Sequence, residues 1–315
     1  MYDLIGDVHG HADELVFLLE MLGYDRRRGG VYFHPERQAV FVGDLIDRGP
    51  KIRETLGIVR GMVEAGRALC IMGNHEFNAL AYHTRDPDDP GKFLRKHDAG
   101  AGKNVRQHFQ TLRQLSPQEL YEHLEWFRRL PLWLDLGDLR VVHACWDVPA
   151  MKRIETAWIP DEGATTQFLK EATDPETELF EAVEDVLKGK ELWLPEGVIF
   201  HDKDGHPRRK LRVKWYESPL DQTYHSYAFE SDSEFPSDPL PVEVFNRVSP
   251  YGENQPPVFF GHYWLRAERP AILAENVVCL DYSVAKGGRL CSYRWNGERT
   301  LSNENFAFVA AFSRQ

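Results

Sequence analysis

Three short polar segments near the start of the chain hold acids, an amide and histidines, side chains from which a metal site can be built. They are Gly6-Asp7-Val8-His9-Gly10, Gly43-Asp44-Leu45-Ile46-Asp47-Arg48-Gly49 and Gly73-Asn74-His75-Glu76. An apolar run typical of a buried strand precedes each segment. Because the carboxyl ends of parallel strands meet at one edge of a sheet, we expect the three segments to converge there.

The residue types in these segments suit a pair of divalent cations, which need a bridging carboxylate and flanking nitrogen and oxygen ligands. Asp7 and His9 are separated by one residue, so a single loop can bring both to one ion. Asp44 follows the next strand and is the candidate for the bridging carboxylate. An amide and two histidines that follow other apolar runs complete the predicted ligand set: Asn74, His143 and His262.

The elements that must position these residues have the pattern of an α/β protein. Apolar runs predict strands at 2–5, 39–42 and 69–72. Leucines at i, i+3, i+4 and i+7 predict an amphipathic helix over 12–22, and a second helix is expected over 52–65. This alternation of strands and helices is typical of a sheet that is covered by helices.

The sequence that follows is less regular. A polar loop is expected over 83–102, and two helices within 104–129 are expected to divide near Ser116-Pro117. Apolar residues alternate on both sides of Gly137-Asp138, which predicts a hairpin. The second strand of that hairpin would end at His143 and bring it to the site.

The stretch 147–257 contains the weakest patterns in the chain. It predicts a helix over 164–187, a strand at 212–216 and a surface loop at 231–241. Strand patterns then return, and the last predicted elements are strands at 258–260, 277–280 and 290–295, with Asn296-Gly297 as the turn into a final hairpin.

The composition limits the class of protein. A chain of 315 residues with 42% apolar residues can fold as one large domain. Its formal charge of −11 argues against a surface that tracks duplex nucleic acid, although a local basic pocket is allowed. The four cysteines form no Cys-x-x-Cys pair, the N-terminus has no signal-peptide pattern, and no apolar run approaches the roughly 20 residues that span a bilayer. We therefore expect a soluble, cytoplasmic protein without a membrane partner.

Taken together, the three polar segments resemble the calcineurin-like metallophosphoesterase superfamily. The Asp-Arg-Gly that ends the second segment is similar to the branch that contains phosphoprotein phosphatases and bacterial diadenosine tetraphosphate hydrolases. The resemblance covers residues 2–80, 130–146 and 257–300. It implies the α/β, four-layer fold of metallophosphoesterases, in which two mostly mixed β-sheets pack as a sandwich and are flanked by helices. We expect one domain over 1–315, with a helical insertion at about 83–130 and a cap-like elaboration at about 147–257.

Carried over to the matching positions, the resemblance implies how the ligands are shared. Asp7, His9 and Asp44 would hold the first metal. The second metal would be held by Asp44, Asn74, His143 and His262. Manganese is the expected metal, with iron, zinc, cobalt and nickel as alternatives, because nitrogen and oxygen ligands accept all of them.

The resemblance also implies three catalytic roles. His75 matches a histidine that protonates the leaving group, Asp47 matches the acid that orients its imidazole, and Arg48 matches a phosphate-binding arginine. A second phosphate-binding cation is expected, and the sequence does not choose among its candidates Arg208, Arg209, Lys210 and Arg212. Four other histidines are interpreted as solvated or packing residues: His11, His83, His97 and His108.

One segment departs from the pattern of many superfamily members, which end with Gly-His-x-His. Here the segment is Gly261-His262-Tyr263-Trp264, and Trp264 cannot bind a metal. The phosphoprotein phosphatase branch shares this departure. The absence of a second histidine in this segment predicts that the first metal is held more weakly than the second.

The predicted function is that of a dinuclear metal-dependent phosphoesterase, in which a hydroxide shared by the two ions attacks phosphorus. Phosphomonoesters, including phosphoserine and phosphothreonine in proteins, are the preferred substrates on the sequence alone. Dinucleoside polyphosphates such as diadenosine tetraphosphate are the enzymatic alternative. A catalytically silent scaffold that binds other proteins is the alternative from another class. The partner is thus a phosphorylated small molecule, a nucleotide or a phosphoprotein, and the sequence leaves the oligomeric state open.

Overall fold

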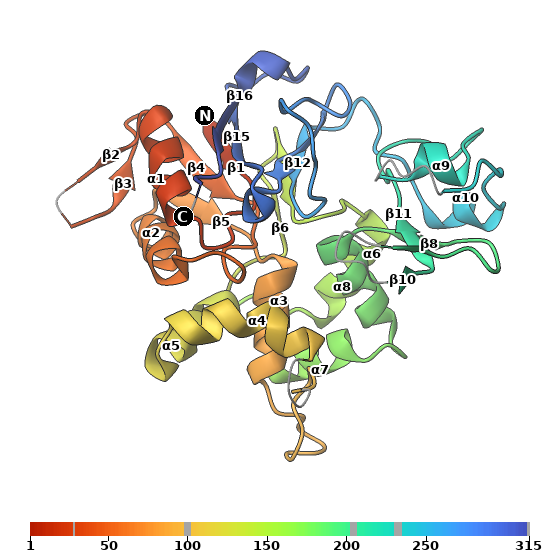
Figure 1. Cartoon of the computed structure of the whole chain (residues 1–315), viewed down its shortest axis with the longest axis horizontal. Coiled ribbons are helices and arrows are strands. Elements are labelled where there is room, and N and C mark those ends of the chain that lie inside the picture. The colour runs from red at the N-terminus through yellow and green to blue at the C-terminus, as the bar shows by residue number, and fades with distance from the viewer. Residues whose placement is uncertain (28, 98–101, 202–206, 230–234, 314–315) are drawn as a thin grey trace.

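Two β-sheets lie at the centre of the molecule (Figure 1). The computed structural model describes residues 1–27, 29–97, 102–201, 207–229 and 235–313. The larger sheet has the strand order β14 (Asp281–Tyr282), β15 (Arg289–Trp295), β1 (Tyr2–Ile5), β4 (Gln38–Phe41) and β5 (Ala68–Cys70), with β16 (Phe306–Ala310) paired to β15. The smaller sheet has the order β13 (Val277–Cys279), β12 (Val258–Phe260), β7 (Arg140–Val142) and β6 (Trp133–Asp135).

Both sheets are mixed, as predicted. In the larger sheet β1, β4 and β5 are parallel, while β1 pairs with β15 in the antiparallel sense. In the smaller sheet β7, β12 and β13 are parallel, while β6 and β7 form the predicted antiparallel hairpin. The parallel strands of each sheet therefore end at a common edge, and the polar segments follow them there.

A continuous apolar layer joins the two sheets. Leu4 and Val40 from the larger sheet pack in one cluster with Phe259 and Val278 from the smaller one, and all four side chains are fully buried. Burial on both faces explains why these strands read as apolar runs in the sequence. The sandwich expected from the sequence is confirmed.

Helices cover the outer side of the larger sheet. The first is α1 (Ala12–Met21), which buries Leu15, Leu18 and Leu19 and packs against β15 and β16. The next two helices along the chain are α2 (Ile52–Glu64) and α3 (Asn74–His83). Between α1 and β4 lies a small hairpin of β2 (Asp25–Arg26) and β3 (Tyr32–Phe33). The predicted helices at 12–22 and 52–65 are confirmed.

The segment predicted as a helical insertion contains α4 (Lys103–Gln114) and α5 (Pro117–Phe127). They divide at the predicted place because Ser116 caps α5: its Oγ accepts the N–H of Glu119, and the Glu119 carboxylate accepts the N–H of Ser116. Within the predicted polar loop over 83–102, residues 98–101 lie outside the described part.

The prediction of one helix over 164–187 is wrong. Two helices occupy this segment, α7 (Thr166–Thr173) and α8 (Glu178–Lys188). Pro175 lacks a backbone N–H and disfavours helical geometry in Asp174, so the first helix stops before them. Thr177 then starts the second helix by accepting the N–H of Phe180 on its Oγ1. Sequence analysis also missed α6 (Val148–Ala157), which begins at the capping residue Asp147.

The predicted strand at 212–216 is largely wrong as well. The strand there, β11 (Lys210–Arg212), ends where the prediction begins, and the chain then turns, with the N–H of Trp215 donating to the carbonyl of Val213. The aromatic residues after Arg212 pack into the interior instead of continuing a ladder. β11 pairs with β8 (Glu191–Trp193), and the other short elements nearby are β9 (Phe200–His201), β10 (Pro207–Arg208), α9 (Tyr224–Tyr227) and α10 (Glu243–Arg247).

These short elements, here called the cap (residues 191–248), share a small apolar cluster of their own. The cap lies to the right of the sheets in Figure 1. Residues 231–234 of the predicted surface loop lie outside the described part, whereas Phe235 and Leu240 are buried in the cap cluster. The proposed single domain with an insertion and an elaboration stays a prediction.

The last hairpin is longer than predicted. β15 does pair with β16, but the connection runs over 296–305 and includes a short 3-10 turn, Asn303–Asn305, so Asn296-Gly297 is not a two-residue turn. Within this connection the carboxylate of Glu298 accepts the N–H of Asn296. In the described part of the chain, no helix combines the length and the apolar character that crossing a membrane would require.

Candidate metal centre

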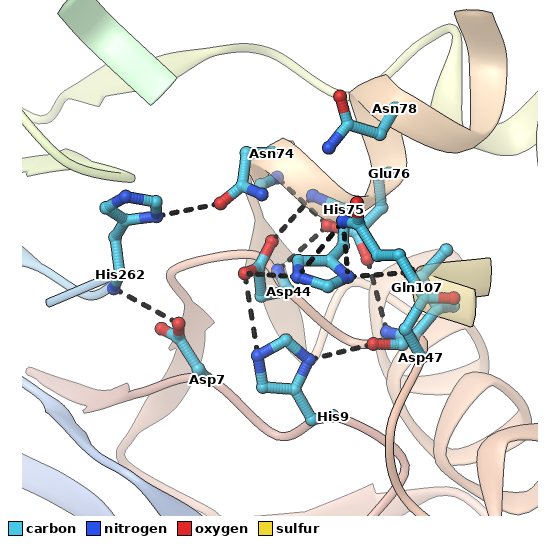
Figure 2. Close-up of polar contacts among 12 residues, drawn as sticks. Asp7, His9, Asp44, Asp47, Asn74, His75, Glu76, Asn78, Gln107 and His262 are labelled. Carbon is cyan, nitrogen blue, oxygen red and sulfur yellow. Dashed lines mark hydrogen bonds and ion pairs between the residues drawn. The ribbon is translucent and has the colours of Figure 1, made fainter. Parts of the chain in front are cut away.

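Asp44 lies at the centre of the site (Figure 2). Its carboxylate oxygens lie 3.6 Å from His9 Nε2, 3.4 Å from His143 Nε2 and 3.9 Å from His75 Nε2. The N–H of His75 also donates to Asp44 Oδ1 at 2.9 Å. Asp44 is only 2% exposed, so this carboxylate is removed from water and surrounded by imidazoles.

The side chains around Asp44 form two groups that could each hold a metal ion. One group is His9, Asp44 and His75, and the other is Asp44, His143 and His262; within each group the ligand atoms lie within 4.8 Å of one another. The two groups share Asp44, an arrangement consistent with a dinuclear metal site. The ligand atoms are nitrogen and carboxylate oxygen, which suit several divalent metals equally.

The other two predicted ligands lie beside these groups. Asp7 Oδ2 accepts the backbone N–H of His262 at 3.1 Å. Asn74 Oδ1 lies 3.1 Å from His143 Nε2 and 2.8 Å from His262 Nδ1. All six side chains that the sequence singled out thus meet at one place, although their roles as ligands stay a prediction.

Unpaired buried atoms indicate that cations fit this site. Among the described residues, Asp7 Oδ1, His9 Nε2 and His262 Nε2 are buried without a hydrogen-bond partner. Leaving a buried polar atom unpaired typically costs about 1–3 kcal/mol, so three at one place need an explanation. Divalent cations between these atoms would supply it.

Backbone carbonyls orient two of the imidazoles. His9 Nδ1 lies 2.8 Å from the carbonyl oxygen of Ile46, and His143 Nδ1 lies 2.7 Å from that of Val42. A proton held on Nδ1 by these contacts leaves the lone pair on Nε2, the atom that faces Asp44 in both residues. Contacts of this kind fix the tautomer of a metal-binding histidine.

The electrostatics of the site also favour bound cations. Burial lowers the pKa of His9 to about 3 and lowers the pKa of His262 well below its usual value, so both rings are neutral at pH 7. Burial alone would raise the pKa of Asp44, but the His143 and His75 imidazoles outweigh it and hold that pKa well below the usual value. The pKa of Asp7 is raised well above its usual value by burial and by the nearby Asp281 and Asp44. Positive charge at the centre would relieve the repulsion between these carboxylates.

The backbone that carries the site is strained. Eight residues other than glycine have a positive φ in the described part of the chain, and six of them lie around the site. Four belong to the polar segments, His9, Asp44, Asp47 and Arg48, and two to the segment 261–264, His262 and Trp264. Such conformations cost about 1–3 kcal/mol each and concentrate at functional sites. These backbone conformations direct side chains from several loops toward one point. No pattern in the sequence indicates such conformations.

Two glycines allow the loops to approach closely. A Cβ atom on Gly73 would lie 2.3 Å from the backbone nitrogen and from Oδ1 of Asp44. A Cβ atom on Gly261 would lie 1.9 Å from Asp7 Oδ1. Each distance is shorter than van der Waals contact, so only glycine fits where the segments meet.

Glu76 has a structural role that the sequence did not reveal. It is fully buried, and its carboxylate accepts the N–H groups of Asp44 and Leu45, both at 2.8 Å, and of Gly73 at 3.0 Å. Burial and the charge of Asp44 raise the pKa of Glu76 to about 7. Glu76 therefore ties the loop after β4 to the start of α3, the two segments that carry Asp44 and Asn74.

Glu76→Gln should destabilise the protein by about 1–3 kcal/mol, because the amide group would place a donor against backbone N–H groups. Urea denaturation of the metal-free protein measures this change. The control is Glu54→Gln, which makes the same change on an exposed position of α2 and should leave the free energy of unfolding within about 0.5 kcal/mol of the wild type. Equal stability of the two variants would contradict the role given to Glu76.

Asp47 and His75 form a buried pair beside the metal groups. His75 Nδ1 lies 2.6 Å from Asp47 Oδ2, which leaves Nε2 directed at the centre. Asp47 Oδ1 lies 2.8 Å from His108 Nδ1 and accepts the Thr111 hydroxyl at 2.5 Å. Burial alone would raise the pKa of Asp47, but the hydrogen bonds from His108 and His75 outweigh it and bring that pKa below its usual range.

The interpretation of His108 as a solvated or packing residue is therefore wrong. His108 is 4% exposed and, with Thr111 one helical turn later on α4, holds Asp47 from the side opposite His75. Their i, i+3 spacing places both side chains on one face of a predicted helix, and this pattern could have indicated that they act together. The other three histidines do pack: His11 lies against Glu14, His83 against His108, and His97 between Tyr82 and Phe93.

The model of the calcineurin-like phosphoesterase family matches residues 2–233. The chain belongs to this family. It is 36% identical over 149 residues to the asymmetrical bis(5'-nucleosyl)-tetraphosphatase PrpE of Bacillus velezensis, a match that covers 45% of this chain and 55% of the relative. It is 23% identical over 312 residues to the symmetrical bis(5'-nucleosyl)-tetraphosphatase of Actinobacillus succinogenes, covering 95% and 94% of the two chains. The chain thus spans about half the length of the first of these relatives.

Among solved structures, the cold-active protein-tyrosine phosphatase of a Shewanella species is similar to this chain. The superposition has a TM-score of 0.48 at 19% sequence identity and covers 99% of this chain and 80% of the other.

In this phosphoesterase, an indole supports the predicted phosphate-binding arginine. The guanidinium carbon of Arg48 lies 4.1 Å from the ring centroid of Trp264. Trp264 is the residue at which the sequence departs from the Gly-His-x-His pattern that the resemblance led us to expect. Its indole offers an aromatic surface to the Arg48 guanidinium.

The metal centre opens into a large basic cleft. The cleft has a volume of about 1360 Å³ and includes Asp44, His75 and His262 in its lining. Among the described residues that line it, eleven are Arg or Lys and six are Asp or Glu. One cationic wall comes from the insertion, with Arg95, Lys103 and Arg106, and the other from Lys188, Lys190 and the cap. The local charge is therefore opposite in sign to the net charge of −11 on the chain.

Proposed function

We propose that this phosphoesterase hydrolyses dinucleoside polyphosphates, of which diadenosine tetraphosphate is the type. The observation that carries this proposal is the basic cleft beside the metal centre, whose eleven cationic residues exceed what one phosphate group needs. Both relatives named above are bis(5'-nucleosyl)-tetraphosphatases, which supports the same substrate class. On the sequence alone we preferred phosphomonoesters, and these two lines of support reverse that preference.

In this proposal the metals are held as the sequence predicted. Asp7, His9 and Asp44 hold one divalent cation, manganese being our first choice. Asp44, Asn74, His143 and His262 hold the other. When bound, such cations neutralise phosphate charge and lower the pKa of water.

The protein groups then have separate tasks. Arg48, supported by Trp264, binds oxygens of the scissile phosphate. Water supplies the oxygen that forms the new bond to phosphorus, and the bond from phosphorus to the leaving oxygen breaks. His75 donates the proton from Nε2 to that oxygen, while Asp47 holds Nδ1 and keeps the ring in place. A cytoplasmic location belongs to this proposal, since the four cysteines are buried free thiols.

Parallel kinetics on three substrates test the proposal. The chain is assayed with Mn²⁺ against diadenosine tetraphosphate, a phosphoserine peptide and p-nitrophenyl phosphate. We expect kcat/KM to be at least about tenfold higher for the dinucleotide than for either monoester. A higher value for the phosphopeptide would favour a protein phosphatase instead. No turnover of any substrate with Mn²⁺, Fe²⁺, Co²⁺, Ni²⁺ or Zn²⁺ would favour the silent scaffold.

A further inference from the structure

Gln107 on α4 lines the cleft and contacts the predicted proton donor. Its Nε2 atom lies 3.3 Å from Nδ1 and 3.4 Å from Nε2 of His75 (Figure 2). Asp47 Oδ2 already binds Nδ1 at 2.6 Å. A donor aimed at the lone pair of one ring nitrogen would lie much closer to that nitrogen than to the other. The near-equal distances therefore place the amide against the face of the imidazole, in a weak N–H···π contact.

A neighbouring arginine fixes the orientation of this amide. Arg95 donates from one terminal nitrogen to Gln107 Oε1 at 2.8 Å and from the other to Asn78 Oδ1 at 2.6 Å. Because a guanidinium only donates hydrogen bonds, the oxygen of Gln107 must face Arg95, and its NH₂ group must face His75. Asn78 is 7% exposed and lies on α3 one turn after Asn74, so it ties the arginine to the helix that begins at the metal centre.

The insertion helix α4 thus contacts both members of the Asp47–His75 pair. His108 and Thr111 bind the carboxylate of Asp47, while Gln107 lies against the ring of His75. Residues 107 and 108 are spaced four and three positions before residue 111, so the three side chains leave the same side of the helix. One helix therefore fixes the acid and the imidazole relative to each other.

The contact with Asp47 alone does not fix the direction of the proton. A ring held at Nδ1 by one hydrogen bond can still tilt about that bond, and the tilt moves Nε2 away from the leaving oxygen. A misplacement of about 1 Å can lower a rate by about 10²-fold. We propose that Gln107 is a positioning residue for His75: its amide, oriented by Arg95, keeps Nε2 directed at the leaving oxygen. This inference rests on the role of proton donor that the proposed function gives to His75.

Two aryl phosphates of nearly the same shape test the proposal. Phenyl phosphate and p-nitrophenyl phosphate differ in one nitro group, and phenolate, the stronger base, depends more on a proton from His75. Gln107→Met keeps the length of the side chain and removes the amide. With Mn²⁺ it should lower kcat for phenyl phosphate by about tenfold at an unchanged KM, and kcat for p-nitrophenyl phosphate by less than about twofold. Equal losses on the two substrates would overturn the proposal, because Gln107 would then bind substrate or only support the fold.

The matched control is Gln118→Met. It makes the same change at an exposed position of α5 that is not among the described residues lining the cleft. Both kcat values of this variant should stay near those of the wild type.

Gln107→Glu separates the position of the ring from the stability of the fold. The carboxylate keeps an acceptor for Arg95, so thermal unfolding should match that of the wild type. It has no donor for the face of His75, so the larger loss with phenyl phosphate should remain. Wild-type kinetics of Gln107→Glu with phenyl phosphate would overturn the role given to the amide.

A double-mutant cycle tests whether Arg95 acts through Gln107. The measured quantity is the ratio of kcat for phenyl phosphate to kcat for p-nitrophenyl phosphate, in which an effect of Arg95 on phosphate binding cancels. Arg95→Met/Gln107→Met should lower this ratio no further than Gln107→Met alone. Additive losses would contradict the orientation of the amide by Arg95.

His75→Asn, assayed with the same two substrates, separates this inference from the proposed function. A larger loss on phenyl phosphate in His75→Asn, with none in Gln107→Met, would overturn the positioning role alone. Equal losses on both substrates in His75→Asn would remove the proton donor from the proposed function, and the positioning role with it. Diadenosine tetraphosphate does not enter this comparison, so failure to hydrolyse it would leave the role of Gln107 standing.

Discussion

Asp44→Asn should abolish metal-dependent hydrolysis, with kcat/KM falling by at least about 10⁴-fold. Asp44 is shared by both candidate metal groups, and three imidazoles lie within 3.9 Å of its carboxylate. An amide cannot supply the bridging anion, so both cations lose affinity together. Steady-state kinetics with Mn²⁺ measure the loss of activity, and isothermal titration measures the loss of binding.

The Asn side chain keeps an oxygen for the N–H of His75, so the variant should still fold. Asp138→Asn is the matched control, because it makes the same change at an exposed position that is not among the described residues lining the cleft. Its activity and Mn²⁺ binding should stay near those of the wild type. An Asp44→Asn protein that retains more than about a tenth of wild-type activity would argue against a shared bridging ligand.

His75→Asn should lower turnover by about 10²–10⁴-fold when the leaving group is an alkoxide, as in a phosphoserine peptide. Asp47 binds Nδ1 at 2.6 Å, so Nε2 remains to donate a proton toward the metal centre. The loss should be much smaller with p-nitrophenyl phosphate, because nitrophenolate can leave without being protonated. Kinetics on both substrates measure this difference.

Metal content decides between two roles for His75, since His75 also belongs to a candidate metal group. We expect His75→Asn to bind as much Mn²⁺ as the wild type. Asp47→Asn is the companion variant, and it should show the same dependence on the leaving group at a smaller magnitude. Loss of one metal from His75→Asn, together with equal losses on both substrates, would make His75 a ligand and not the proton donor.

The core of the site could be predicted from the sequence because its geometry follows from strand topology. Parallel strands β1, β4 and β5 bring Asp7, Asp44 and Asn74 to one edge, and β7 and β12 do the same for His143 and His262. Apolar runs locate such strands well, since both of their faces are buried. Convergence of their polar ends then requires only that the strands be parallel.

The surroundings of the site could not be predicted in the same way. Glu76 binds backbone N–H groups, and no pattern of side chains marks such partners. His108 reaches Asp47 only because α4 packs over the loop after β4. The contact of Arg48 with Trp264 likewise joins two loops that are far apart in sequence.

The cap was the least predictable part for a different reason. Its elements are two to five residues long, too short for a helical or strand period to emerge. A proline at position 175 also divided a segment whose apolar pattern reads as one helix. Residues of both the cap and the insertion line the basic cleft, so the cleft forms only in the folded protein. The net negative charge of the sequence therefore does not indicate the positive charge of the cleft.

Diffraction from crystals soaked in Mn²⁺, recorded at the manganese absorption edge, tests the central claim most directly. We predict two anomalous peaks on either side of Asp44, one beside His9 and one beside His143 and His262. A single peak, no peak, or peaks that do not contact Asp44 would contradict a dinuclear centre in this protein.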